Sequence, residues 1–183
     1  MRSLLFALLL TLANGAFAQT KMSEALKSMP DSLMPYLTHN NRLDCIDFRE
    51  ANMKAEVRNV FEGKSDLRQL TSDYAFFRLS DASSVELCLL DAEGQQLICM
   101  IQTYGTGLRE SVISFYTTSW QQLPTAQYLP VAHEGLAARY DAEQMVLTLE
   151  SNNYLNRAAM EEQKEEEKVQ TKLKWCNSVF KES

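Results

Sequence analysis

The sequence predicts an α+β fold, in which N-terminal helices pack on a mostly antiparallel, meandering sheet of six to eight strands. Two observations lead to this prediction. Residues 72–120 contain four apolar runs separated by turn sequences, and the residues before position 53 have the spacing of short amphipathic helices. The predicted strands are consecutive and do not alternate with helices, which argues against a Rossmann-type cofactor fold.

The four runs are rich in Val, Ile, Phe and Tyr and are bounded by Ser, Asp and Gly, as is typical of antiparallel strands. They comprise residues 74–79, 85–90, 97–103 and 112–117. A turn centred on Glu93 and Gly94 pairs Cys88 with Cys99 in the middle hairpin. Both faces of that hairpin are then apolar, so each needs a covering layer. We expect the N-terminal helices to cover one face, and the loop at 121–138 with the C-terminal segment to cover the other.

Residues 1–18 have the features of a secretory signal peptide: Arg2, a short apolar run, and Ala16 and Ala18 at a small-x-small cleavage site. Cleavage before Gln19 leaves a single domain, 19–183, with 17 basic and 24 acidic residues. No apolar stretch of this mature chain has the length of about 20 residues that a membrane span needs. We therefore expect an exported protein, periplasmic or secreted, with no transmembrane segment. Its acidic balance, without clusters of Lys and Arg, argues against nucleic acid as a partner.

The remaining elements follow in chain order. A helix is expected within 19–30, where Pro30 ends it, then a turn or two at 31–37, and a third helix from Asn40 or Asn41 to about residue 52. A more polar hairpin, 54–61 with 67–70, precedes the meander. The irregular loop at 121–138 is followed by a strand at 144–149, a charged helical segment at about 157–170 and a terminal hairpin at 172–180.

The four cysteines permit two disulfides in an oxidising compartment, and Cys88 with Cys99 is the natural pair. These two residues occupy a hydrogen-bonded position of the hairpin, where Cα atoms lie about 5.5 Å apart and the side chains are directed less well for a bridge. A disulfide and two buried free thiols are both consistent with the sequence. Cys-x-x-Cys and Cys-x-x-His spacings are lacking, so no metal site is predicted.

Candidate catalytic residues are few. Asp44 and Asp47 are three residues apart on one predicted helix, and His39 precedes them, so a hydrolase acting on envelope polymers is the alternative function. The sequence has neither a Gly-x-Ser-x-Gly nor a His-Glu-x-x-His motif. The glycines at 105 and 107 join two strands, which favours a turn with positive φ over a phosphate loop, so no cofactor is predicted.

Aromatic residues recur near the turns and on the later strands, where they serve either the core or a binding surface. The predicted partner-binding residues are Tyr104, Tyr116, Trp120 and Tyr128. They would form an exposed patch for a protein or a glycan, because Tyr and Trp supply a large contact area at a low cost in entropy.

The order of several motifs resembles a family of exported Bacteroidetes proteins that is catalogued only as a domain of unknown function. These motifs include Met29-Pro30-Asp31-Ser32-Leu33, Asn41-Arg42-Leu43-Asp44, Ile113-Ser114-Phe115-Tyr116 and Tyr128-Leu129-Pro130. The resemblance covers nearly the whole mature chain and implies a secreted or periplasmic single domain, but no activity. The predicted function is therefore a non-catalytic envelope protein that binds a protein or glycan partner.

Overall fold

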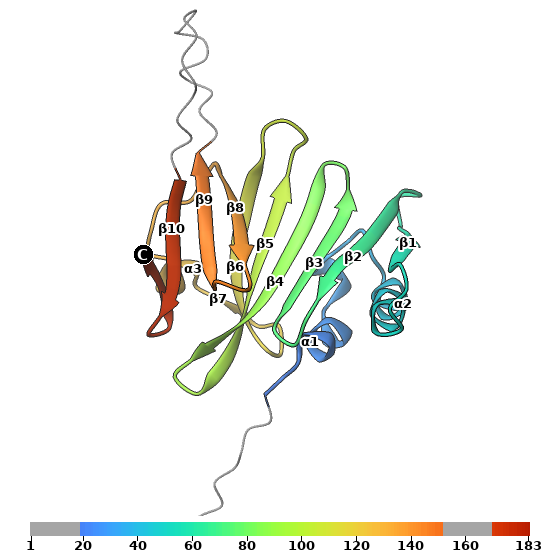
Figure 1. Cartoon of the computed structure of the whole chain (residues 1–183), viewed down its shortest axis with the longest axis horizontal. Helices are drawn as coiled ribbons and strands as arrows, with labels where there is room; N and C mark the ends of the chain where they lie inside the picture. The colour runs from blue at the N-terminus through green and yellow to red at the C-terminus, as the bar shows by residue number, and fades with distance from the viewer. Residues whose placement is uncertain (1–18, 152–169) are drawn as a thin grey trace, which may run out of the picture.

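The computed structural model describes residues 19–151 and 170–183 of the chain. The predicted signal peptide and nearly all of the charged segment predicted at 157–170 lie outside these residues. In the described residues the chain forms three layers, with helices on one side of a seven-stranded sheet and a four-stranded sheet on its other side (Figure 1). The α+β class with a mostly antiparallel sheet is thus confirmed.

The first sheet has the strand order β1 to β7, so each strand pairs with its neighbour in sequence. Every pairing is antiparallel. The strands are β1 (Glu56–Arg58), β2 (Lys64–Leu70), β3 (Tyr74–Ser80), β4 (Ser83–Ala92), β5 (Gln95–Tyr104), β6 (Glu110–Thr117) and β7 (Gln122–Leu123). All four runs of the predicted meander form strands, and the polar hairpin before them forms β1 and β2.

The hairpin of β4 and β5 has the predicted register. Cys88 pairs with Cys99, and the turn residues Glu93 and Gly94 have φ values of 48° and 84°. Its two apolar faces separate into two clusters of buried residues, one facing the helices and the other facing the second sheet. This division explains why charged residues are scarce along both strands, since a central strand that is covered on both faces has no wet side.

The helices α1 (Met22–Ser28), η1 (Asp31–Leu33) and α2 (His39–Glu50) cover one face of the first sheet. The third predicted helix begins slightly earlier than expected, because Thr38 is the N-cap and not Asn40 or Asn41. Thr38 Oγ1 accepts the backbone N–H of Asn41, and the Asn41 side chain accepts the N–H of Thr38. This reciprocal pair is a capping box, which satisfies two otherwise unpaired donors.

A fully buried arginine joins these helices. Arg42 of α2 donates hydrogen bonds to the carbonyl oxygens of Leu26, Met29 and Leu37, and its Nη1 lies 2.8 Å from Asp31 Oδ1. Its guanidinium therefore satisfies carbonyls at the end of α1 and in the turns that follow, where helical hydrogen bonds have stopped.

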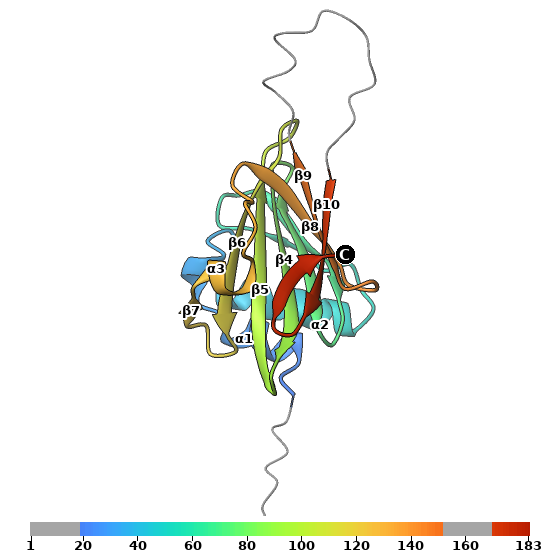
Figure 2. The ribbon, with the colours of Figure 1, turned by 90° about the vertical axis from the view of Figure 1, so that its left-hand side faces the viewer.

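The second sheet was only partly foreseen. Its order is β11-β10-β9-β8, with β8 (Leu136–Asp141), β9 (Val146–Ser151), β10 (Gln170–Cys176) and β11 (Val179–Glu182). β10 and β11 form the expected terminal hairpin. The segment predicted as an irregular loop, 121–138, instead contains β7, the short helix α3 (Thr125–Tyr128) beside β6, and the start of β8 (Figure 2). Thr125 Oγ1 donates to the carbonyl of Ile113, which holds α3 against the edge of β6.

The described residues contain no helix that is long and apolar enough to cross a membrane. All four cysteines are free in the structure, and Cys88 donates a weak hydrogen bond from Sγ to the carbonyl of Cys99 at 3.7 Å. Of the two interpretations that the sequence allowed, the structure therefore has the buried free thiols.

Candidate functional site

The four predicted partner-binding residues do not share a surface. Tyr116 and Trp120 lie in the core beneath the helices, with ring centroids 5.7 Å apart, and Tyr128 lies in the other core, 5.1 Å from Phe115. Only Tyr104 is exposed, at 46%. This corrects the predicted aromatic patch: burying such large side chains stabilises the two cores more than exposing them would.

Trp120 has a structural role in the described fold. Its Nε1 donates to the carbonyl oxygen of Ala25 at 3.0 Å, and Ser28 Oγ lies 3.3 Å away. The indole therefore ties α1 to the end of β6. A buried Trp needs such a partner for its N–H, and a helix end supplies carbonyls without intrahelical donors.

The candidate hydrolase residues are not brought into a cleft. His39, Asp44 and Asp47 are all exposed on α2, and the cavities described below are built from other elements. Along the axis of an α-helix, residues 39 and 47 are separated by about 12 Å. Within residues 19–151 and 170–183, no cluster of three His, Cys, Asp or Glu side chains is arranged to hold a metal ion.

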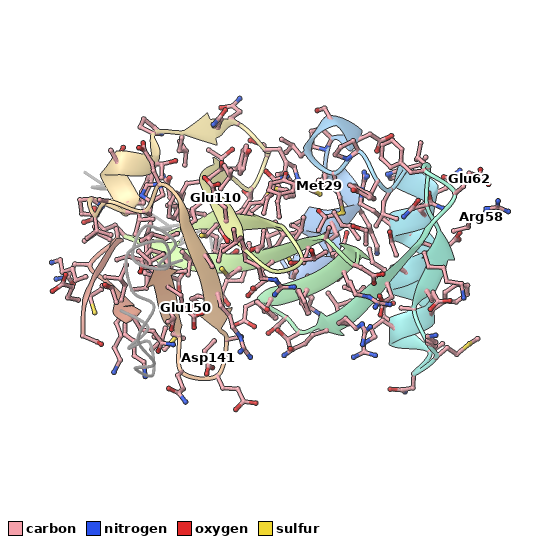
Figure 3. The ribbon with its side chains drawn as sticks, turned by 90° about the horizontal axis from the view of Figure 1, so that it is seen from above. Met29, Arg58, Glu62, Glu110, Asp141 and Glu150 are labelled. Atoms are coloured by element: carbon pink, nitrogen blue, oxygen red, sulfur yellow. The ribbon has the colours of Figure 1, made fainter. Side chains whose placement is uncertain are left out.

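A cavity of the described residues lies between the two sheets. This inter-sheet cleft has a volume of about 500 Å³ and is open to solvent on one side. Strands β2 to β5 of the first sheet form one wall, and β8, β9 and the turn between them form the other. Asp141 and Glu150, two residues of the second wall, lie far from Arg58 and Glu62 at the opposite end of the molecule (Figure 3).

A buried carboxylate stands at the base of the cleft. Glu86 of β4 is only 7% exposed and points to the face that carries Cys88 and Leu90. Its Oε2 accepts hydrogen bonds from the Tyr74 hydroxyl at 2.9 Å and from the backbone N–H of Tyr140 at 3.0 Å. No described residue donates to its second oxygen, Oε1, which leaves that atom as an acceptor for a ligand.

Burial raises the pKa of the Glu86 carboxyl, because a low-dielectric surrounding disfavours its charged form. The hydrogen bonds from Tyr140 and Tyr74 and the positive charge of Arg139 oppose this shift without cancelling it. Burial also raises the pKa of the Tyr74 hydroxyl, and the negative charge of Glu86 is the second-largest cause of this rise. Tyr74 is therefore a hydrogen-bond donor to Glu86 at every pH at which proteins are ordinarily stable.

A second polar pair holds β8 above the first sheet. Ser111 Oγ accepts the N–H of Ala138 at 2.8 Å and lies 2.8 Å from Thr103 Oγ1. Ala138 and Tyr140 are two residues apart on β8, so their N–H groups point the same way, toward the first sheet. Side chains of the first sheet thus satisfy the exposed edge of β8, which would otherwise offer unpaired donors.

The cleft is polar and carries an acidic balance. Its acidic residues are Glu86, Asp141, Glu143 and Glu150, and its basic residues are Arg109 and Arg139. Gln69, Ser84 and Thr103 add neutral polar groups, and Phe76 is a half-buried aromatic at the wall. Such a lining suits hydrogen-bonding ligands without negative charge and does not suit an apolar ligand, whose sites are lined mainly by apolar side chains.

Sequence reasoning missed this site, although a signal was present. Glu86 stands between Val85 and Leu87 inside a strand whose two faces are otherwise apolar. A carboxylate buried at such a position must either pair with a hydrogen-bond donor or become protonated. It therefore marks a candidate functional site. The other wall could not be found, because the start of β8 lies in the segment that was predicted as a loop and the rest of β8 was assigned to no element.

Comparison with known proteins gives a family and a fold. Residues 14–176 match the family described as "Protein of unknown function (DUF3256)". A solved structure, described as a domain of an uncharacterized protein from Porphyromonas gingivalis W83, is similar with a TM-score of 0.70 and 17% sequence identity. The similarity covers 88% of this chain and 96% of that one, and at this identity it establishes the fold alone. No curated protein matches the sequence. The predicted resemblance to a Bacteroidetes family of unknown function is confirmed.

Proposed function

We propose that this chain, which belongs to the family described as "Protein of unknown function (DUF3256)", is an exported, non-catalytic protein that binds a glycan in the inter-sheet cleft. One observation carries this proposal. Polar side chains from two different sheets line one cleft of about 500 Å³, which includes the carboxylate of Glu86.

The chemistry of the lining supports a glycan as the ligand. Sugar hydroxyls both donate and accept hydrogen bonds, which carboxylates, amides and guanidinium groups can satisfy together. The cleft offers Glu86 Oε1 as an acceptor, Gln69 as donor and acceptor, and Arg139 as donor. Phe76 presents part of an aromatic ring, and the C–H face of a sugar packs against such a ring.

Other ligand classes are less well supported. Four carboxylates against two guanidinium groups disfavour nucleic acids and phosphorylated ligands, whose binding rests on basic residues. An extended peptide would bind by adding a strand to a free edge. The edge of β8 that faces the first sheet is already bonded to Ser111 and Glu86.

The first test is binding to an array of neutral glycans, followed by calorimetry with the glycans that bind. We expect Gln69→Ala and Arg139→Ala to weaken binding at least tenfold, since each removes a hydrogen-bonding group of the cleft. Gln121→Ala and Arg58→Ala are matched controls, because both side chains are exposed and lie outside the cleft. Unchanged affinity in both cleft variants would refute this site.

Two further measurements test the remaining parts of the proposal. Mass spectrometry of bound glycan after incubation with the protein should show an unchanged mass, whereas cleavage would favour the hydrolase alternative. Mass spectrometry of protein recovered from the culture medium or periplasm should show Gln19 as the first residue. A mature protein that retains residues 1–18 would exclude export by signal cleavage.

A protein partner would use a different surface. Asn59, which is 5% exposed, accepts the N–H groups of Phe61 and Gly63 and donates to Ser65 and to the Leu79 carbonyl. This turn holds Phe61 at 63% exposure, with its ring 5.0 Å from that of Tyr36. The protein-partner alternative would be favoured if an envelope protein bound the natural protein and Gln69→Ala but not Phe61→Ala. The natural protein would at the same time bind no glycan.

A further inference from the structure

A second cavity adjoins the inter-sheet cleft. It has a volume of about 290 Å³ and lies where the N-terminal segment at Gln19 and Thr20 meets the β4–β5 hairpin, the turn after β8, and β10. We call it the hairpin cavity. Tyr74, Tyr140 and Ala142 line both the hairpin cavity and the inter-sheet cleft. The two cavities therefore share a wall made of these three residues.

The shared wall is fixed in place. The rings of Tyr74 and Tyr140 have centroids 6.2 Å apart, and both residues are hydrogen-bonded to Glu86, one through its hydroxyl and the other through its backbone. Both side chains are also buried, at 5% and 6% exposure. Ala142 is the smallest of the three residues that line both cavities.

The hairpin cavity is more apolar than the cleft, with Leu89, Leu90 and Met145 in its lining, but it shares part of the chemistry of the cleft. Trp175 is half-buried, and its ring is held by a hydrogen bond from Nε1 to the carbonyl of Asp91 at 2.6 Å. The carboxylates of Asp73 and Asp91 and the amide of Gln96 also line the cavity. One partly exposed aromatic ring is combined with acceptors and an amide, as Phe76 is in the cleft. Unlike the cleft, the hairpin cavity has no basic side chain of the described residues in its lining.

We propose that the inter-sheet cleft and the hairpin cavity are two subsites for one neutral oligosaccharide, whose successive units lie on either side of the Tyr74–Tyr140 wall. This inference rests on the proposed glycan-binding function. It adds that the ligand is a chain of two or more sugars and that affinity rises with chain length, because the second subsite adds contacts within the same binding event.

The test measures affinity against chain length, with N-acetylglucosamine and glucose oligomers of one to six units and the same series of any array ligand. We expect at least a tenfold gain in affinity between the monomer and the trimer of the bound sugar. Met145→Ala shortens an exposed side chain of the hairpin cavity and should reduce this gain. Met53→Ala, an equally exposed methionine outside both cavities, is the matched control.

A blocking variant gives a second readout. Ala142→Trp places a bulky side chain at the wall that the two cavities share and should prevent one oligomer from occupying both, so that oligomers bind only as tightly as the monomer. A circular dichroism spectrum like that of the natural protein would verify its fold. The two-subsite inference would be overturned if oligomers of all lengths bound with equal affinity. It would also be overturned if the gain in affinity with chain length were unchanged in both Met145→Ala and Ala142→Trp. Neither result would overturn the proposed glycan binding. Absence of binding to the array and to both series would overturn the proposed function as well.

Discussion

The backbone N–H of Tyr140 donates a hydrogen bond to Glu86 Oε2 at 3.0 Å, so a carboxylate of the first sheet pairs with an N–H group of β8, an edge strand of the second sheet. This relationship explains how a charged residue is tolerated between two apolar layers. The carboxylate gains two donors, and β8 gains an acceptor for an edge N–H group. The same contact sets the spacing of the two sheets, and the cleft opens beside it.

The ionisation of Glu86 should make stability depend on pH. Burial raises its pKa in the folded protein above the ordinary value of about 4.3 that the unfolded chain keeps. The contribution of Glu86 to stability is therefore fully present below the unfolded pKa of about 4.3, and it is lost as the pH rises through the higher pKa of the folded protein. Glu86→Gln keeps an acceptor oxygen but cannot ionise. Urea unfolding from pH 4 to 8 should show the natural protein losing free energy of unfolding relative to Glu86→Gln as pH rises.

Glu86→Leu removes the acceptor altogether and serves as the companion variant. The N–H of Tyr140 and the hydroxyl of Tyr74 are then buried without a partner, which costs about 1–3 kcal/mol for each unsatisfied group. We expect this variant to be less stable than Glu86→Gln throughout the pH range. A constant difference between the natural protein and Glu86→Gln from pH 4 to 8 would contradict the assigned shift.

Arg42 should be among the most sensitive positions of the helical layer. Arg42→Met keeps a long apolar stem but leaves the carbonyls of Leu26, Met29 and Leu37 without their donor. We expect a loss of about 3–5 kcal/mol in the free energy of unfolding, measured by urea denaturation. Arg58→Met is the control, because the exposed Arg58–Glu62 pair should contribute less than about 1 kcal/mol. Equal losses in the two variants would be inconsistent with a structural role for Arg42.

Thiol labelling distinguishes the two cysteine arrangements. Cys45, Cys88 and Cys99 are buried and Cys176 is exposed. Burial raises the pKa of the Cys45 thiol to about 12, so it contains almost no reactive thiolate at neutral pH. Protein purified without reductant should react at one cysteine when folded and at four when unfolded. Two reactive thiols in the unfolded protein would show that Cys88 and Cys99 form a disulfide after all.

Gly105 should not tolerate a side chain. Its φ is +104°, and a Cβ atom there would lie 1.7 Å from the carbonyl oxygen of Leu108. Gly105→Ala must therefore move the backbone of the β5–β6 turn, and we expect a loss of more than about 1 kcal/mol in thermal or urea unfolding. Gly107→Ala is the matched control in the same turn, since no atom lies within 4 Å of its added Cβ. A neutral Gly105→Ala variant would require another conformation for this turn.

The β4–β5 hairpin, which has a strong local signal, was predictable in detail. A two-residue turn at Glu93 and Gly94, flanked by apolar runs, fixed the register of β4 and β5 and hence which residues face each layer. The short strand β7 and the strand β8 lacked such signals. Their residues alternate weakly, and Pro124, Pro130 and Gly135 interrupt the pattern, so β8 forms only because it finds β9 and the acceptors of the first sheet.

The predicted binding residues failed for a related reason. Tyr116, Trp120 and Tyr128 were chosen because aromatic residues serve both interfaces and cores, and the sequence does not say which role each has. Tyr116 and Trp120 are buried beneath the N-terminal helices, as the bond from Trp120 to Ala25 illustrates. Tyr128 is buried because α3, which carries it, packs against β6. Glu86 had the stronger local signal, a charge within an apolar strand, but its meaning depended on a wall that comes from residues 136–150.

Periodicity, turn chemistry and local motifs were enough to predict the α+β class, the meander from β3 to β6, the need to cover both of its faces, and the family. What covers the second face and where the cleft lies depend on contacts between segments far apart in the chain. A cleft is formed by side chains from distant strands, and its position depends on how the second sheet docks. That docking is fixed by contacts such as Glu86 to Tyr140 and Ser111 to Ala138, which span 54 and 27 positions of the chain.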